Sequence, residues 1–166
     1  MNAPTCPHRA TVAAQPLADV AASLGLGGAD IARRLAFLDV GAADTAHLAA
    51  LHAGLGDAQR GFGDAFYATL RRIPELAPLL PDDATVARLQ AAHETYFAEL
   101  IAGPHDEAYV ARRLQVGLTH ARIGLKPEWY AGAFRRYLSA MLRTILDWAG
   151  DDEARFLATY DALLKV

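Results

Sequence analysis

Apolar residues recur at spacings of three and four along most of this chain, and this helical period restricts the possible fold more than any other feature of the sequence. One such stripe consists of Val86, Leu89, Ala92, Tyr96 and Leu100. Strand signals are almost absent, and no internal repeat is visible at the periods of roughly 20–50 residues that mark repeat proteins. We therefore predict an all-α protein with about seven or eight helices of unequal length.

Aspartates, glycines and prolines divide the chain into its predicted helices. Asp30, Asp106 and either Asp82 or Asp83 stand where an aspartate can cap a helix N-terminus. Gly124 is a stop signal, and Pro127 stands where a first-turn proline is tolerated. The prolines at 74, 78 and 81 interrupt the helical pattern. Helices are expected over about 17–24, 57–73, 84–102, 127–149 and 152–166. Further helical segments are expected to carry Ile31, Leu35 and Leu38, then Leu48, Leu51, His52 and Leu55, and, between Asp106 and Gly124, His120.

Length and composition indicate one globular domain. The chain has 166 residues, of which 53% are hydrophobic and 21% are charged, and its net charge of -3 gives no electrostatic footprint for nucleic acid. Cys6 is the only cysteine, which excludes an internal disulfide and a C-x-x-C-H haem attachment. No apolar run approaches the roughly 18 residues of a membrane span and no signal peptide is recognisable, so we expect a cytoplasmic protein.

The segment 127–149 carries apolar residues on more than one face. Its first stripe consists of Tyr130, Phe134, Tyr137, Met141 and Ile145, and its second consists of Leu138, Leu142 and Leu146. A helix covered on one side by its own core needs only one stripe. The second stripe therefore predicts burial against a partner or another domain. The chain also ends at ALLKV without a helix stop signal, so we expect it to continue into a further domain.

The sequence contains six histidines, and none belongs to a zinc motif; nucleophile elbows and phosphate loops are also absent. Any chemistry would therefore come from a cofactor. On a helix, His120 shares its face with Gly117 and Gly124, which leave room beside the imidazole. These residues alone leave two interpretations open: a structural histidine with a hydrogen-bond partner, or an axial ligand beside a large flat cofactor such as haem.

The segment around His120 resembles the proximal segment of the globin-coupled sensors, the bacterial haem-based gas sensors. The stretch YVARRLQVGLTHARIGLKPEWYAGAF at 109–134 is similar in its tyrosine, arginine, Val-Gly pair, H-x-R-I-G-L run and P-x-W-Y motif. The matching residues are Tyr109, Arg113, Val116, Gly117, His120, Arg122, Ile123, Gly124, Leu125, Pro127, Trp129 and Tyr130. The resemblance extends more weakly over about 28–166.

This resemblance implies a globin fold, a 3-over-3 helical sandwich with an extra N-terminal helix and little or no D helix. It implies non-covalent haem b with His120 as the proximal iron ligand. Residues 28–166 would form the sensor domain, residues 1–27 a partly disordered extension, and an output domain would follow. Such a domain binds dioxygen, with CO or NO as alternatives, forms a homodimer through its last two helices, and is not itself an enzyme.

The same resemblance assigns the distal side of the haem. Tyr67, in the F-Y pair of DAFYATL, takes the distal role. A phenol donor favours dioxygen, because bound dioxygen is partly anionic whereas CO stays nearly neutral. Ala92 stands where family members often carry Thr or Ser, which puts a second polar contact in doubt. His93 is expected either as a distal iron ligand in the gas-free state or as a residue at the pocket edge.

Further residues are expected around the cofactor. Leu89, Ala92 and His93 would line the distal pocket with Tyr67. The expected haem neighbours are Phe62, Phe66, Leu70, Leu79, Arg113, Val116, Gly117, Ile123, Tyr130, Phe134 and Tyr137, with Arg113 and Arg122 reaching either the propionates or solvent. Two rival functions stay open: a stand-alone globin that binds oxygen or consumes NO, and a haem-free helical interaction module.

Overall fold

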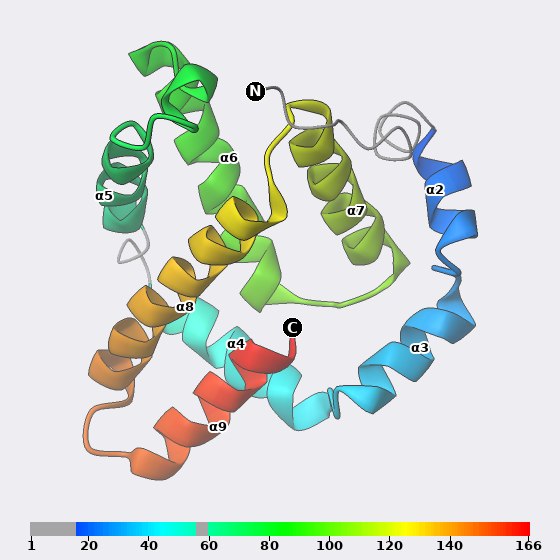
Figure 1. The fold of residues 1–166 in the computed structure, drawn as a ribbon. Helices are drawn as coiled ribbons and strands as arrows, with labels where there is room; N and C mark the ends of the chain where they lie inside the picture. Colours follow the sequence, from blue (N-terminus) through cyan, green and yellow to red (C-terminus); the bar gives the residue numbers. More distant parts are fainter. Residues whose placement is uncertain (1–15, 56–59) are drawn as a thin grey trace. The chain divides into compact units, whose positions relative to one another are not determined.

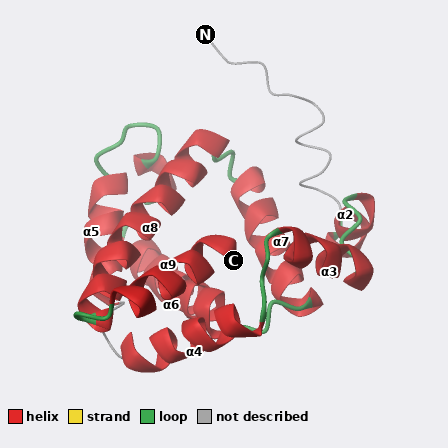
Figure 2. Ribbon diagram, turned by 90° about the horizontal axis from the view of Figure 1, so that it is seen from below, coloured by secondary structure: helices red, strands yellow, loops and turns green. Residues whose placement is uncertain are grey.

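The computed structural model describes residues 16–55 and 60–166, and the regular structure in these ranges is helical throughout (Figures 1 and 2). The predicted all-α class is confirmed. Residues 1–15 of the expected N-terminal extension lie outside the described ranges. No helix in these ranges is both long enough and apolar enough to cross a membrane.

The chain divides into two compact units. The first comprises Met1–Asp39 and Pro104–Phe134, and the second comprises Val40–Gly103 and Arg135–Val166. The first unit contains the helices α2 (Leu17–Ser23), α3 (Gly28–Phe37), α7 (Glu107–Arg122) and the first turns of α8 (Pro127–Ala149). Helix α2 packs on α7. The start of α3 also approaches α7, because a side chain at Gly28 would meet the carboxylate of Glu107.

The second unit is built around α4. Its elements are α4 (Ala42–Leu55), α5 (Arg60–Leu70), the short 3-10 helix η2 (Ala77–Leu79), α6 (Asp83–Ala102), the remainder of α8, and α9 (Glu153–Lys165). Helix α4 packs against both α6 and α9, and α5 packs against α6 (Figure 1). The fully buried side chains include Leu48 and Leu51 of α4, Leu100 of α6 and Ile145 of α8.

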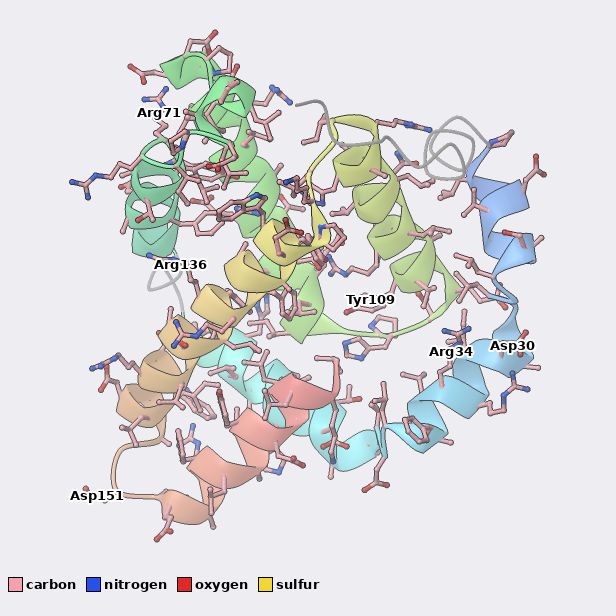
Figure 3. The ribbon with its side chains drawn as sticks, viewed as in Figure 1. Asp30, Arg34, Arg71, Tyr109, Arg136 and Asp151 are labelled. Atoms are coloured by element: carbon pink, nitrogen blue, oxygen red, sulfur yellow. The ribbon has the colours of Figure 1, made fainter. Side chains whose placement is uncertain are left out.

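Side-chain caps define three helix starts. The carboxylates of Asp82, Asp106 and Asp152 accept backbone hydrogen bonds from Thr85, Tyr109 and Arg155 at 2.7, 2.9 and 2.9 Å. Each bond satisfies an N–H group that the first helical turn leaves without a partner. Asp82 and Asp106 are thus confirmed as caps. Asp83 instead pairs with Arg71 at 2.6 Å (Figure 3 labels Arg71).

The structure corrects the prediction at Asp30. Helix α3 begins at Gly28 with Gly27 as its N-cap, so Asp30 is not the cap but lies in the first turn and pairs with Arg33. An acidic side chain there still complements the positive end of the helix dipole. The aspartate signal was therefore real, but it marked the wrong position by one turn.

The helix predicted over 57–73 is shorter at its C-terminus. Helix α5 ends at Leu70, and Arg72 and Ile73 bond back only three residues, to the carbonyls of Thr69 and Leu70. The reason is Pro74, which disfavours the helical conformation of the residue before it. The expected start at 57 falls on residues 56–59, and the side chain of Phe62 also lies outside the described part of the structure.

The two apolar stripes of α8 have different surroundings. Tyr137, Met141 and Ile145 of the first stripe are buried in the second unit. Leu142 and Leu146 of the second stripe are 37% and 48% exposed. Leu138 of the same stripe is half-buried, and burial of this stripe against a partner or another domain stays a prediction.

Candidate functional site

His120 lies in the last turn of α7, where the backbone is fixed by a Schellman motif. Gly124 has φ +75°, its N–H bonds to the carbonyl of Ala121 at 3.1 Å, and the N–H of Leu125 bonds to the carbonyl of His120 at 2.9 Å. A residue with a side chain is strained at this φ, so the glycine is required by the backbone. Gly124 therefore ends α7 as expected and also locks the main chain at His120.

The imidazole of His120 has the properties of a neutral ligand. Its Nδ1 atom is buried and has no hydrogen-bond partner among the described residues. Burial lowers the pKa of His120 below 6.5, so the ring is uncharged at neutral pH. A structural histidine would be expected to satisfy its buried nitrogen. The interpretation of His120 as a structural histidine requires a hydrogen bond that holds the ring. The described residues provide no such bond at Nδ1.

Apolar side chains around His120 are exposed. The ring centroids of His120 and Tyr130 are 5.2 Å apart, and Tyr130 and Ile123 are 39% and 48% exposed. A Cβ atom at Gly117 would meet nothing within 4 Å. Val116 and Phe134 are half-buried, and the ring of Phe134 lies 6.4 Å from that of Tyr130. The first unit thus places the exposed side chains of Tyr130 and Ile123 near an imidazole whose Nδ1 has no partner among the described residues, which suits a large flat apolar ligand.

Arg113 is not a solvated helix arginine. Its guanidinium lies 4.5 Å from the centroid of the Tyr109 ring, which in turn meets His105 edge-on at 4.7 Å. Tyr109 is buried, and that burial raises the pKa of its phenol. Tyr109 and Arg113 are four residues apart in α7, and this spacing could have indicated the contact between them (Figure 3 labels Tyr109). By contrast, Arg122 is exposed at the end of the helix.

In the second unit, Tyr67 of α5 makes a hydrogen bond to His93 of α6. The phenol oxygen lies 3.0 Å from Nδ1 of the imidazole. Tyr67 is only 4% exposed, and burial raises the pKa of its hydroxyl to about 12, so the phenol is neutral. The sequence identified both residues but did not predict the bond between them.

Aromatic rings surround this pair. The His93 ring lies 5.3 Å from Phe66 and 5.2 Å from Phe97 between centroids. Phe97 stacks on Tyr137 of α8 at 3.7 Å, with the two ring planes 3° apart. Phe97 was missed at the sequence level, although it follows His93 by four residues on α6. The other expected pocket residues are less enclosed: Leu70, Leu79 and Leu89 are half-buried, and Ala92 is exposed.

The family model described as Protoglobin matches residues 28–166, which is most of the chain. The chain belongs to the protoglobin family. Its curated relatives include the "Heme-based aerotactic transducer HemAT" of Halobacterium salinarum, which is 30% identical over 125 residues. That match covers 75% of this chain and 26% of the relative, so the chain spans about a quarter of that protein.

A solved structure is similar to this protoglobin over most of its length. It is the globin domain of the Geobacter sulfurreducens globin-coupled sensor, with a TM-score of 0.73 and 26% sequence identity. The match covers 80% of this chain and 87% of that one. The globin fold and the resemblance to the globin domains of globin-coupled sensors are therefore confirmed for this protoglobin.

Proposed function

We propose that this protoglobin is the haem-binding, gas-sensing domain of a signalling protein, with haem b held without a covalent bond and His120 as its proximal ligand. The observation that carries the proposal is the neutral imidazole of His120, whose buried Nδ1 has no partner among the described residues and which lies beside exposed apolar side chains. A haem would cover this surface. Membership of the protoglobin family and similarity to a haem-based transducer support the same assignment.

When bound, haem would supply an iron that can bind dioxygen or, as alternatives, CO or NO. The protein supplies selectivity. Tyr67 is buried and keeps its proton, so it offers a neutral phenol hydrogen to a partly anionic ligand. Such a bond contributes about 1.5–3 kcal/mol, enough to favour dioxygen over CO by roughly ten- to a hundredfold. The domain itself would bind gas and report it without catalysis, and any enzymatic activity would belong to an output domain.

The remaining residues would hold the cofactor in supporting roles. Val116, Gly117, Ile123, Tyr130 and Phe134 would provide its apolar surroundings on the first unit. Arg113 is held over Tyr109 and could meet a propionate with its guanidinium. Phe66, Leu70, Leu79, Leu89 and Ala92 would line the distal side of the pocket with Tyr67 and His93.

The signal would leave the domain through a homodimer of its last two helices. Leu142 and Leu146 of α8 are exposed in the single chain, as are Leu157 and Leu164 of α9. Burying these side chains against a second copy would be favourable, at about 25 cal/mol per Å² of apolar surface. Gas binding would then shift the packing of the dimer by its different affinity for two arrangements, typically by 1–3 kcal/mol.

Two measurements test the gas-binding proposal. The purified chain should carry haem and show a Soret absorption band, and His120→Ala should lose most of that haem. In the loaded protein, Tyr67→Phe should release dioxygen about ten- to a hundredfold faster, with CO release nearly unchanged. Equal changes for both gases would show that Tyr67 acts only through its bulk. A chain that stays colourless when supplied with haemin would instead support a haem-free interaction module.

The dimer has its own test. Changing Leu142 and Leu146 together to lysine should convert a dimer to a monomer in analytical ultracentrifugation. Arg135→Glu changes charge at another exposed position of α8 and serves as the control. A wild-type chain that is monomeric at high concentration would rule out the proposed interface.

A further inference from the structure

The hydrogen bond between Tyr67 and His93 uses the one hydrogen that the phenol has to offer. The two atoms are 3.0 Å apart, and either ring could in principle be the donor. We assign Tyr67 as the donor, because a phenol O–H is a stronger donor than an imidazole N–H and an imidazole nitrogen is a stronger acceptor than a phenol oxygen. In this arrangement the hydroxyl hydrogen points to Nδ1 of His93.

The packing around the pair keeps the two rings in place. Tyr67 is almost completely buried, and its ring lies 5.3 Å from both the Phe66 and the His93 rings. On the other side of His93, Phe97 is stacked on Tyr137. These contacts join α5, α6 and α8 within one unit. His93 is half-buried, and its contacts with Phe66 and Phe97 favour the orientation in which the imidazole meets the phenol.

Resting on the proposed function, we propose that His93 is a positioning residue that competes with dioxygen for the hydroxyl hydrogen of Tyr67. A single hydrogen cannot bond fully to two acceptors, so each dioxygen that Tyr67 stabilises must displace the bond to His93. His93 thereby sets how strongly the domain prefers dioxygen over CO. By holding this hydrogen, His93 reduces the stabilisation that Tyr67 gives to bound dioxygen. The same hydrogen bond keeps the phenol in one orientation.

The first test compares two substitutions of similar shape in the haem-loaded chain. His93→Leu removes the acceptor, and His93→Asn keeps a polar atom near the position of Nδ1. His93→Leu should slow dioxygen release by roughly three- to tenfold and leave CO release unchanged. This factor is the expected gain when the phenol hydrogen is no longer shared between His93 and dioxygen. His93→Asn should return the rate toward the wild-type value. If both variants release dioxygen at the wild-type rate, His93 does not compete.

A double-mutant cycle shows whether the effect passes through the phenol. In a Tyr67→Phe background, His93→Leu should no longer slow dioxygen release. If the slowing persists without the phenol, the proposal is wrong. The Tyr67→Phe single variant distinguishes a failure of the proposed distal role of Tyr67 from a failure of the proposed competition by His93. If it changes dioxygen and CO release equally, the proposed distal role of Tyr67 fails; if it is selective but His93→Leu has no effect, only the competition by His93 fails.

The hydrogen itself can be located without measuring gas release. In the CO-saturated ferrous protein, which is diamagnetic, ¹⁵N-labelled histidine allows the two imidazole nitrogens of His93 to be distinguished by NMR. Nδ1 should carry no proton, and its resonance should shift in Tyr67→Phe. A proton on Nδ1 would overturn the proposal, because the phenol hydrogen would then be unused. A gas-free ferrous spectrum that changes from six- to five-coordinate in His93→Leu would also overturn it, since His93 would then be an iron ligand.

Discussion

Nζ of Lys165 lies 2.9 Å from Oδ1 of Asp44, and this ion pair connects the last turn of α9 to the first turn of α4. The other carboxylate oxygen of Asp44 accepts a hydrogen bond from the N–H of Gly41 at 2.8 Å, just before α4 begins at Ala42. One side chain therefore caps α4 and fixes the end of α9. Both partners are largely buried, so water screens the pair less than it would on the surface.

Asp44→Asn tests this connection through its pH dependence. The hydrogen bond from Gly41 and the ion pair with Lys165 both lower the pKa of Asp44 below 3.8. A lowered pKa stabilises the folded protein at all pH values above 3.8, and this stabilisation is lost as the pH falls through the folded pKa. Asp44→Asn should thus unfold at a lower temperature at pH 7, and the difference should shrink only below about pH 4. A difference that is constant down to pH 3 would show that the charge is unimportant.

Thr159→Val should stabilise the protein. The hydroxyl of Thr159 in α9 is fully buried and has no hydrogen-bond partner among the described residues. A buried hydroxyl without a partner costs about 1–3 kcal/mol, and valine has nearly the same shape. We expect the free energy of unfolding to rise by about 1 kcal/mol and Tm by about 2–4 °C, measured by thermal unfolding at equal haem loading.

Thr144→Val provides the matched control, because the hydroxyl of Thr144 donates to the carbonyl of Ala140 at 3.2 Å in α8. This substitution removes a hydroxyl that already has a hydrogen-bond partner, so it should not raise the free energy of unfolding. An equal gain from both substitutions would contradict the explanation, since it would then reflect a general preference for valine in these helices.

Gly54→Ala should destabilise the contact between α4 and α8. A Cβ atom at Gly54 would clash with Nε1 of Trp148, and the indole also lies 3.5 Å from the guanidinium of Arg155, measured to the ring centroid. The indole would have to shift, and with it its contact to Arg155, before an alanine could fit. The clash should outweigh the better helix propensity of alanine, and we expect a net loss of about 1–2 kcal/mol in denaturant unfolding.

Gly132→Ala is the control for this substitution. A Cβ atom at Gly132 in α8 would meet nothing within 4 Å, so only the helix propensity changes. It should increase stability by up to about 1 kcal/mol. If Gly54→Ala stabilised to the same extent, the close approach to Trp148 would not restrict this position.

Features set by short stretches of sequence could be predicted well. Asp82 and Asp106 cap helices because capping needs only a side-chain oxygen and an N–H three residues later. Gly124 was recognisable as the end of α7 for the same local reason. Asp30 was misplaced because an aspartate is favourable both at the cap and in the first turn, and the two positions cannot be distinguished from the residue type alone.

The residues of the candidate site stay a prediction from the sequence, and the contacts between them could not be predicted. His120 and Tyr67 were identified from a motif that lies along the chain. The bond from Tyr67 to His93 joins residues 26 positions apart, and its geometry depends on how α5 packs on α6. Arg113 and Tyr109 are closer to each other in sequence. Whether the guanidinium lies on the tyrosine ring or in solvent depends on the side-chain rotamer of Arg113. Such contacts are decided by packing, which the residue pattern does not specify.

The central claim is that the imidazole of His120 holds the haem, and haem titration of His120→Gly with and without added imidazole tests it most directly. The wild-type chain should take up one haem and show its Soret band without imidazole. His120→Gly should bind haem weakly, and free imidazole should restore binding by occupying the space of the lost side chain. Equally tight haem binding by His120→Gly without imidazole, or no haem uptake by the wild-type chain, would contradict the account.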